Sequence, residues 1–441
     1  MEDIINNQLS NFLCHNKILH EHQFGFLKGH SAAEQVALLQ QKWTTAMEKN
    51  QTTAIAFLDL SNAFGTVPHE ALRHRLLASG IRGNLYGWIS NYLTNRQQQT
   101  RVGNSFSSWK PLSAGVPQGS VLAPTLFTLF INSLIKAVNS KPFENSPPVE
   151  CMAYADDSLI YASHTDPVMA VAYVNKSLQD ILAWSKIWGM KFNTTKTVSM
   201  LISKSKKRPA PKGITFENKL ISFSQIHMHL GIVLTNNLKY ENHVKHICSK
   251  INRELYAFRI LCSNIPYCKD LLIQLYKTYN RPRLECGSLA FAGIGKVLSD
   301  RLESLQNRAI RYILRLPLRT HLGLTNYDEV KLELLSVRRA RIIASTAYKM
   351  INDTCPRAFL LYKPLQRQLN YNLRQTYYEL PKNMQPTNPP SERFRRAPLS
   401  LTSGIINILP HSSLQSCSLS AFQTHLKSLA SHVLCNFPNQ S

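Results

Sequence analysis

The sequence Met152-Ala-Tyr-Ala-Asp-Asp-Ser-Leu-Ile-Tyr161 sets two adjacent carboxylates, those of Asp156 and Asp157, between two apolar arms. Apolar arms on both sides of a short polar centre predict a β-hairpin whose tight turn carries the carboxylates. Burying an ionised carboxylate is costly unless a cation or strong donors offset the lost hydration. Adjacent carboxylates also repel, which raises the proton affinity of one of them unless a divalent ion binds. The pattern therefore predicts a cation site at the hairpin turn.

A third carboxylate, that of Asp59, interrupts the apolar run Thr53-Ala-Ile-Ala-Phe-Leu-Asp-Leu60, which is typical of a strand buried on both faces. Oxygen ligands without nearby His or Cys favour Mg²⁺ or Mn²⁺ over zinc. Two such ions suit phosphoryl transfer, since one lowers the pKa of an attacking hydroxyl and the other neutralises a pyrophosphate leaving group. A structural alternative stays open, in which the Asp156-Asp157 pair makes an Asx-type turn and Asp59 caps a helix starting near Asn62.

Between these acidic stretches lies the loop Ala114-Gly-Val-Pro-Gln-Gly-Ser-Val-Leu-Ala-Pro124. Gly115 and Gly119 are expected to let backbone approach a ligand closely. Gln118 offers an amide to a base or a sugar, and Ser120 is expected to cap the apolar helix that follows. A glycine-containing loop before a helix occurs in many folds, so the loop becomes specific only together with the carboxylates.

The charge balance indicates a polyanionic partner. The 441 residues include 51 Lys and Arg against 26 Asp and Glu, a formal net charge of +25. Nucleic acid is the commonest partner of so basic a chain. A membrane is not expected, because the longest apolar stretch, Val121 to Ile135, is interrupted by Pro124 and Asn132 and is too short to cross a bilayer.

Strand and helix signals are mixed along the first half of the chain. A helix is predicted from Glu70 to Ser79, ended by Gly80, and strands from Gln97 to Val102 and from Phe106 to Leu112 are joined at Gly103-Asn104. Beyond about residue 240 the apolar spacing is helical. The predicted fold class is therefore α+β.

Five stretches, taken in order, resemble the successive palm motifs of reverse transcriptases: Phe57-Leu-Asp-Leu-Ser-Asn-Ala-Phe64, Gly115-Val-Pro-Gln-Gly-Ser120, Tyr154-Ala-Asp-Asp157, Phe192-Asn-Thr-Thr-Lys-Thr197 and His229-Leu-Gly-Ile-Val233. The alanine of Tyr-Ala-Asp-Asp and the upstream Gln23-Phe-Gly-Phe26 are similar to the non-LTR branch, which is LINE-like or Jockey-type. Three positions depart from the family pattern: Leu27 stands in place of Arg, Asn62 where Lys is common, and Gly65 where Asp is common.

The resemblance implies a right-hand polymerase fold with partial fingers, a palm and a thumb, and a mainly helical C-terminal region. The implied domains are fingers and palm over 1–235, a thumb-like region over 236–330, and a helical region over 331–441 with a Pro-rich basic linker at 381–398. The chain is expected to be truncated at the N-terminus, within the fingers.

The resemblance also implies roles for single residues. Asp59, Asp156 and Asp157 are the implied catalytic metal ligands, together with the carbonyl of Leu60, and Lys196 is the implied general acid. Phe64 is expected to crowd the 2′ position of an incoming nucleotide. Gln118, Gly119 and Tyr154 complete the implied nucleotide and template site, and Leu230 and Gly231 the primer grip.

The implied activity is RNA-directed DNA synthesis, in which two Mg²⁺ or Mn²⁺ ions assist transfer from a dNTP to a primer 3′-hydroxyl. The expected partners are an RNA template, a DNA primer, a dNTP and an endonuclease supplied elsewhere, in the nucleus or the cytoplasm. Two alternatives stay open. One is a catalytically impaired, element-derived protein that only binds nucleic acid. The other is a viral-type RNA polymerase, against which the bulk of Phe64 argues.

Overall fold

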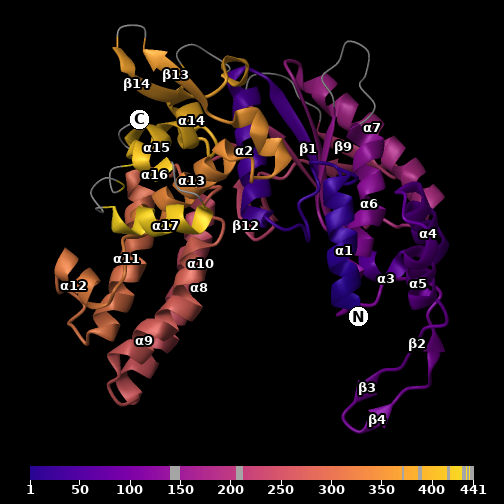
Figure 1. Ribbon diagram of the computed structural model, residues 1–441, viewed down its shortest axis with the longest axis horizontal. Coiled ribbons are helices and arrows are strands. Elements are labelled where there is room, and N and C mark those ends of the chain that lie inside the picture. Colours follow the sequence, from indigo (N-terminus) through magenta and orange to yellow (C-terminus); the bar gives the residue numbers. More distant parts are fainter. Residues whose placement is uncertain are drawn as a thin grey trace. The chain divides into compact units, whose positions relative to one another are not determined.

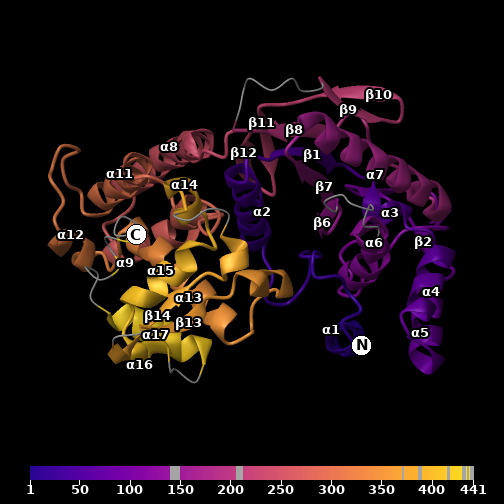
Figure 2. The ribbon, with the colours of Figure 1, turned by 90° about the horizontal axis from the view of Figure 1, so that it is seen from above.

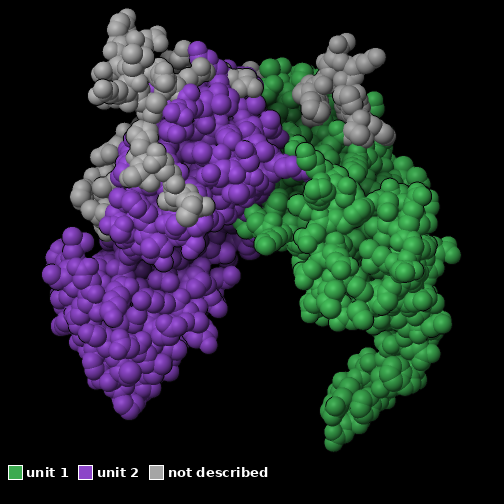
Figure 3. All heavy atoms as spheres, viewed as in Figure 1, with its two compact units in different colours: residues 1–31, 51–224 green, residues 32–50, 225–441 purple. Residues whose placement is uncertain are grey.

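The computed structural model describes residues 1–139, 149–204, 212–369, 372–385, 390–414, 418–429, 434 and 437. These residues form two compact units (Figure 3). Unit 1 combines Met1–Ser31 with Gln51–Ser224, and unit 2 combines Ala32–Asn50 with Gln225–Ser441. Among the described residues, no helix has both the length and the apolar character needed to span a membrane.

Unit 1 is built on a four-stranded antiparallel sheet with the strand order β6-β7-β1-β8. The strands are β6 (Glu150–Tyr154), β7 (Asp157–His164), β1 (Thr52–Leu58) and β8 (Val198–Ile202). The apolar run before Asp59 thus becomes a central strand, and all seven residues of β1 are buried. The prediction of a strand buried on both faces is confirmed.

One face of this sheet packs against the helices α6 (Ala123–Asn139) and α7 (Pro167–Trp188), which lie side by side (Figure 1). Side chains alternate between the two faces of a strand. Ala54, Ala56 and Leu58 face the helices and belong to the core that the helices close. Asp59 therefore projects from the opposite face, the one that α6 and α7 leave uncovered.

Short helices and two hairpins complete unit 1. The helices are α1 (Glu2–His15), α3 (Ala63–Thr66), α4 (His69–Ala78) and α5 (Gly83–Leu93). The helix predicted from Glu70 is confirmed as α4, and Gly80 follows it with a φ of 84°. The hairpin of β9 (Gly213–Phe216) and β10 (Lys219–Ser222) lies along α7 (Figure 2).

A two-stranded segment leaves unit 1 after α5 (Figure 1). Its strands are β2 (Gln97–Gln98), β3 (Arg101–Val102), β4 (Ser105–Phe106) and β5 (Lys110–Pro111). β2 pairs with β5 and β3 with β4, and Gly103-Asn104 form the turn. The predicted hairpin is confirmed, although each long strand is divided into two short ones.

Unit 2 is mainly helical, as predicted. It begins with α2 (Ala32–Glu48) and a hairpin of β11 (Ile226–His229) and β12 (Ile232–Thr235). Its longer helices are α8 (Glu241–Asn264), α11 (Lys296–Ile313) and α13 (Leu335–Ile351). The shorter ones are α9 (Lys269–Leu275), η1 (Tyr276–Asn280), α10 (Arg281–Glu285), α12 (Leu324–Glu329), η2 (Arg357–Tyr362), η3 (Lys382–Met384), α14 (Glu392–Arg395), α15 (Leu401–Ile408), α16 (His411–Leu414) and α17 (Leu419–Ser428).

Helix α2 belongs to unit 2 although the chain enters unit 1 on both sides of it. The Gln41 side chain explains part of this: its Oε1 accepts from the amides of Leu399 and Ser400, at 3.1 Å each, and its Nε2 donates to Ser400 Oγ at 2.9 Å. Gln41 is fully buried, so these bonds replace hydration that it loses. The domain boundaries at 235 and 330 remain predictions.

One hairpin in the C-terminal region was not expected from the sequence. β13 (Leu365–Leu369) pairs with β14 (Asn372–Glu379). Its strands carry many polar residues and no clear apolar alternation, so they give a weak strand signal. Of the predicted linker 381–398, residues 386–389 lie outside the described residues, and the described part includes α14, where Phe394 is buried.

Candidate active site

The turn of the β6–β7 hairpin holds Asp156, and Asp157 is the first residue of β7. Tyr154 pairs with Asp157, so that Ala155 and Asp156 alone form the loop. Ala155 has a positive φ of 58°, a conformation that non-glycine residues adopt uncommonly outside tight turns. The predicted tight turn is confirmed.

Asp59 lies beside this turn. In the pairing of β1 with β7, Leu58 is opposite Ser158, so the next residue along β1, Asp59, comes level with Asp157. Residues opposite each other in an antiparallel pair project from the same face of the sheet. The fold thus brings Asp59 to the same end of the sheet as Asp156 and Asp157, which follow it by almost a hundred residues in the sequence.

The charges of these groups act on one another. Desolvation, and then the negative charges of Asp156 and Asp59, raise the pKa of the Asp157 carboxyl group. Such repulsion is what a divalent cation would offset. Within the described ranges, no three His, Cys, Asp or Glu side chains form a ready metal cage. Mg²⁺ does not require one, because it is usually bound by one or two carboxylates together with water and substrate phosphates.

The hydrogen bonds of the neighbouring residues fix the direction of the Leu60 carbonyl. The amide of Asn193 donates to the carbonyl of Asp59 at 2.8 Å, and the amide of Ser61 donates to the carbonyl of Lys191 at 2.8 Å. Carbonyls of successive residues point to opposite sides of a strand. The Leu60 carbonyl is therefore directed away from residues 191–193 and toward β7, the strand that begins at Asp157.

Lys196 lies three residues after Asn193, whose amide bonds to the Asp59 carbonyl. Phe192 bridges to Leu60, and the next residue, Asn193, starts an Asx turn in which its Oδ1 accepts from the amides of Thr195 at 3.1 Å and Lys196 at 3.3 Å. The structure thus fixes the backbone of the Lys196 turn next to Asp59. The side chain of Lys196 is exposed.

Phe64 is held between two other aromatic rings. It stacks on Phe127 of α6, with 4.3 Å between ring centroids and 18° between planes, and meets Phe26 edge to face at 6.0 Å. Phe127 is fully buried, whereas Phe26 is exposed and has a positive φ of 58°. The ring of Phe64 is therefore supported from behind by a rigid core residue.

The segment His22–Phe26, for which no role was predicted from the sequence, packs against the turn that carries Asp156. Gln23 bridges to Ala153 of β6, and the amide of Phe24 donates to the Ala153 carbonyl at 2.9 Å. A Cβ on Gly25 would lie 2.2 Å from the amide nitrogen of Ala155, so only glycine fits against the turn. The glycine between two aromatic residues was the signal in the sequence.

The two glycines of the loop Ala114–Pro124 have different surroundings. The amide of Gly115 donates to the Val67 carbonyl at 2.8 Å, and a Cβ on Gly115 would lie 2.8 Å from the Gly65 carbonyl oxygen. The expectation that Gly115 makes room for a ligand is wrong, because protein backbone takes that room. Gln118 and Gly119 are exposed, and nothing lies within 4 Å of a Cβ placed on Gly119.

Two departures from the family pattern are coupled in space. A Cβ on Gly65 would lie 2.5 Å from Nδ2 of Asn62, so the Asn62 side chain fills the space that a side chain at position 65 would need. Asn62 precedes α3 in the left-handed conformation, with a φ of 49°, and makes no side-chain cap. Asp59 likewise does not cap α3, so the structural alternative for this acid is not observed.

Ser120 caps α6, as predicted. Its Oγ accepts from the amides of Leu122 at 3.2 Å and Ala123 at 3.3 Å. The same hydroxyl donates to the Glu2 carboxylate at 2.6 Å, and this hydrogen bond is the main reason why the pKa of Glu2 is lowered. Helix α1 is thereby tied to the loop that carries Gln118.

Leu230 and Gly231 lie in unit 2 and form the two-residue turn between β11 and β12. Their φ angles are 49° and 77°, the combination of two positive values that a type I′ hairpin turn requires. The pair therefore forms a tight turn. Their role as a primer grip stays a prediction.

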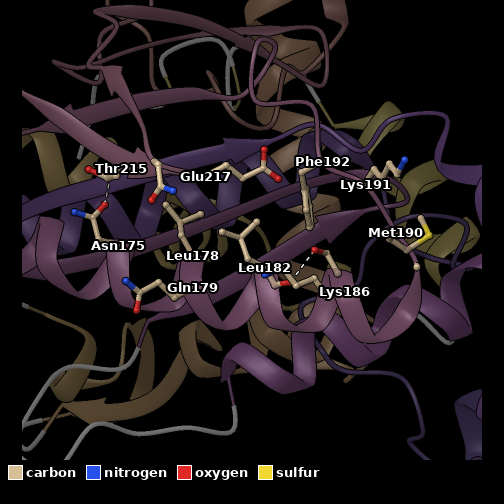
Figure 4. A pocket seen from close by; sticks show the side chains of 13 residues that line it. Asn175, Leu178, Gln179, Leu182, Lys186, Met190, Lys191, Phe192, Thr215 and Glu217 are labelled. Carbon is tan, nitrogen blue, oxygen red and sulfur yellow. Dashed lines mark hydrogen bonds between the residues drawn. The ribbon is translucent and has the colours of Figure 1, made fainter.

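The groove in Figure 4 is separate from the carboxylates. It measures about 1020 Å³ and lies in unit 1 between α7 and the β9–β10 hairpin, with Lys186, Phe192 and Glu217 among its lining residues. It opens on the helix side of the sheet, whereas Asp59 projects from the other side. None of the predicted site residues lines it.

The family model described as reverse transcriptase (RNA-dependent DNA polymerase) matches residues 1–236. This chain belongs to the reverse transcriptase family. The predicted right-hand polymerase fold and the kinship with Jockey-type non-LTR elements are confirmed. Reverse transcriptases as a family use divalent metal ions, which suits the oxygen-rich donor set of this site.

Two similar proteins come from mobile elements of Drosophila melanogaster. A probable RNA-directed DNA polymerase from transposon BS of Drosophila melanogaster is 28% identical over 371 residues, covering 83% of this chain and 40% of the relative. The RNA-directed DNA polymerase from mobile element jockey of the same species is 26% identical, covering 71% of this chain and 34% of the relative. The chain thus spans less than half the length of these reverse transcriptase relatives.

Among solved structures, apo telomerase from Candida tropicalis is similar to this reverse transcriptase with a TM-score of 0.43 and 11% identity. The alignment covers 71% of this chain and 50% of the telomerase chain.

Proposed function

We propose that this chain is an RNA-directed DNA polymerase of a non-LTR retrotransposon, which transfers a nucleotide from a dNTP to a primer 3′-hydroxyl. The observation that carries the proposal is the meeting of Asp59 with the Asp156-Asp157 turn at one end of the sheet. Membership of the reverse transcriptase family over residues 1–236 supports it.

In this proposal Asp59, Asp156 and the carbonyl of Leu60 hold two divalent ions, with Asp157 assisting. The donors fit Mg²⁺ or Mn²⁺ because all are hard oxygen atoms and because desolvation, together with the charges of Asp156 and Asp59, raises the pKa of Asp157. When bound, the ions would lower the pKa of the primer hydroxyl and neutralise the pyrophosphate. The strands of the sheet keep the carboxylates at fixed positions, so little reorganisation is needed at the moment of reaction.

Residues around the carboxylates select and orient the nucleotide. Phe64, supported by Phe127, blocks the position of a 2′-hydroxyl and so favours dNTP over rNTP. Gln118 and Gly119, both exposed on the loop before α6, contact the template or the nucleotide together with Tyr154. Lys196, on the turn beside Asp59, protonates the leaving pyrophosphate.

The proposed partners follow from the reaction: an RNA template, a DNA primer and a dNTP. Such a basic protein attracts nucleic acid through its net charge of +25. An endonuclease supplied elsewhere would create the primer. The proposed place of action is the nucleus or the cytoplasm, where the template and the target meet.

Primer extension on an RNA template, with purified protein and Mg²⁺, tests the proposal. Asp156→Asn is expected to lower the rate at least about 100-fold, because it removes one ligand at the reacting phosphate. Asp3→Asn, an exposed acid in the first turn of α1, is the matched control and is expected to extend primers at the parent rate. Activity of the Asp156 variant within a few-fold of the parent would reject the site.

A parent protein that binds RNA but extends no primer at any Mg²⁺ or Mn²⁺ concentration would reject the proposed activity. That result would instead favour the catalytically impaired alternative. Incorporation of rNTP as readily as dNTP would reject the proposed role of Phe64 and favour an RNA polymerase.

A further inference from the structure

The two-stranded segment 96–112, which we call the basic ribbon, exposes large apolar side chains. Val102 is 75% exposed, Phe106 is 58% exposed and Trp109 is 61% exposed. A two-stranded hairpin without a covering layer is marginally stable in water, and exposed apolar groups gathered on such an element indicate a surface for binding. The proposed reaction uses none of these residues.

The charge around the basic ribbon has one sign. From residue 71 to residue 143, a run of 73 positions between Glu70 and Glu144, the sequence contains no Asp and no Glu, although the chain has 26 such residues. The ribbon itself carries Arg96, Arg101 and Lys110. No carboxylate of this run can neutralise these cations, so the surface is complementary to an anion.

Cations and aromatic rings are interleaved on the ribbon. The guanidinium group of Arg101 lies 5.4 Å from the ring centroid of Phe106, which pairs with it across β3 and β4. At the base of the ribbon, the guanidinium of Arg96 lies 5.0 Å from the ring centroid of Tyr92 and donates to the Tyr92 carbonyl at 3.1 Å. Ring faces that stack bases, next to cations that follow phosphates, are the combination used by proteins that bind single strands.

We propose that the basic ribbon binds single-stranded RNA, with bases stacked on Phe106 and Trp109 and phosphates held by Arg101 and Lys110. The proposal rests on the proposed function, in which RNA is the template. An apolar protein partner fits less well, because the ribbon's cations, which form no ion pair among the described residues, would lose hydration without gaining a counter-charge.

The ribbon is anchored beside the site. Ala114 bridges to Pro68, and the amide of Val116 donates to the Phe64 carbonyl at 2.8 Å. From this base to the turn at Gly103-Asn104, a strand of seven or eight residues reaches about 25 Å at 3.3 Å per residue. The ribbon visibly extends away from the sheet of unit 1 (Figure 1). RNA bound along it would lie outside the site, next to the loop that carries Gln118.

The test measures binding of the full chain to a fluorescently labelled, unstructured single-stranded RNA by anisotropy, in EDTA so that no metal contributes. Phe106→Ala and Trp109→Ala are each expected to raise the dissociation constant roughly fivefold or more, because each removes one stacking face. A double variant that binds as tightly as the parent would overturn the proposal.

Leucine variants at the same two positions separate stacking from general apolar contact. Phe106→Leu with Trp109→Leu keeps apolar area but has no aromatic face, so its affinity is expected to fall as far as that of the alanine variant. Parent-like affinity would overturn the stacking role. Leu220→Ala, on the β9–β10 hairpin and 61% exposed, is the matched control and is expected to bind RNA as the parent does. An equal loss in that control would overturn the assignment to the ribbon.

Failure of this proposal is distinguishable from failure of the proposed function. If no primer is extended but the ribbon variants still lose RNA, the polymerase activity fails and the ribbon proposal stands. If primers are extended but the ribbon variants bind RNA like the parent, the ribbon proposal fails alone. Thermal unfolding midpoints equal to that of the parent show that the variants are folded, as expected for exposed side chains.

Discussion

Two hairpins of unit 1 differ in almost every respect that decides what a hairpin can do. The β6–β7 hairpin lies within a four-stranded sheet and carries acids at its turn, whereas the basic ribbon has two strands and carries cations and exposed rings. The first can hold like charges close together because packed strands fix them. The second leaves its side chains free to follow a flexible ligand. Fixed acids suit chemistry on a phosphate, and exposed cations suit holding a strand.

The largest expected difference between the hairpins is the cost of adding one methyl group. Gly25→Ala places a Cβ 2.2 Å from the amide nitrogen of Ala155, so the free energy of unfolding is expected to fall by about 3 kcal/mol. Gly103→Ala meets nothing within 4 Å and bears only the cost of its φ of 61°, about 1 kcal/mol. Urea unfolding of both variants measures the difference. Equal losses would mean that Gly25 does not pack against the turn.

A second pair contrasts two phenylalanines. Phe64→Ala removes the ring between Phe26 and Phe127, and is expected to lower the preference for dNTP over rNTP by about tenfold. Phe106→Ala is expected to leave that preference unchanged, since the ribbon carries none of the residues proposed to bind the nucleotide. Competition between the two nucleotides in primer extension measures it. A change of preference in the ribbon variant would contradict the separation of roles.

A smaller expected effect is the stabilisation of the fold by Mg²⁺. Desolvation and the charges of Asp156 and Asp59 raise the pKa of Asp157. Mg²⁺ would offset the repulsion among these carboxylates, so at saturating Mg²⁺ the unfolding midpoint of the parent is expected to rise by about 2–5 °C. The rise is expected to shrink in Asp157→Asn and to persist in Lys110→Gln, a change of similar size on the ribbon. Differential scanning fluorimetry with and without Mg²⁺ measures the shift. A full rise in the Asp157 variant would remove that residue from the ion site.

The smallest expected effect is on the salt dependence of RNA binding. Arg101→Gln removes one phosphate contact, so the slope of log affinity against log salt is expected to become shallower by about 0.7. A titration from 50 to 300 mM salt measures this slope, and Asp156→Asn serves for comparison because it removes no cation. An unchanged slope in the Arg101 variant would show that this side chain holds no phosphate.

Features encoded by neighbouring residues could be predicted from the sequence. The apolar run before Asp59 became β1, the hairpin turn at Asp156 is tight as predicted, and Gly103-Asn104 forms the turn of the ribbon. In each case local periodicity or turn chemistry is sufficient, because the contacts that matter lie within a few residues. The acids of the site were found in this way, since each interrupts an apolar stretch of the sequence.

Features made by distant residues could not be predicted in that way. The aromatic residues on either side of Gly25 mark this glycine as unusual but do not indicate that it packs on Ala155, and nothing near Gly115 indicates that it admits the backbone of Gly65. The assignment of α2 to unit 2 depends on Gln41 meeting residues more than 350 positions away. Such contacts are set by the assembled fold. A sequence pattern can mark a glycine or an amide as unusual, but it does not show which distant residue that group contacts.

Both outer strands of the unit 1 sheet carry a short extra pairing. On β6, the Ala153 carbonyl accepts from the amide of Phe24 and the Ala153 amide donates to the His22 carbonyl, and on the far side Phe223 bridges to Ser199 of β8. Unpaired strand edges are templates on which other chains can add β-structure. These two stretches shorten the open edges to a few residues, and so guard a highly apolar sheet against intermolecular aggregation.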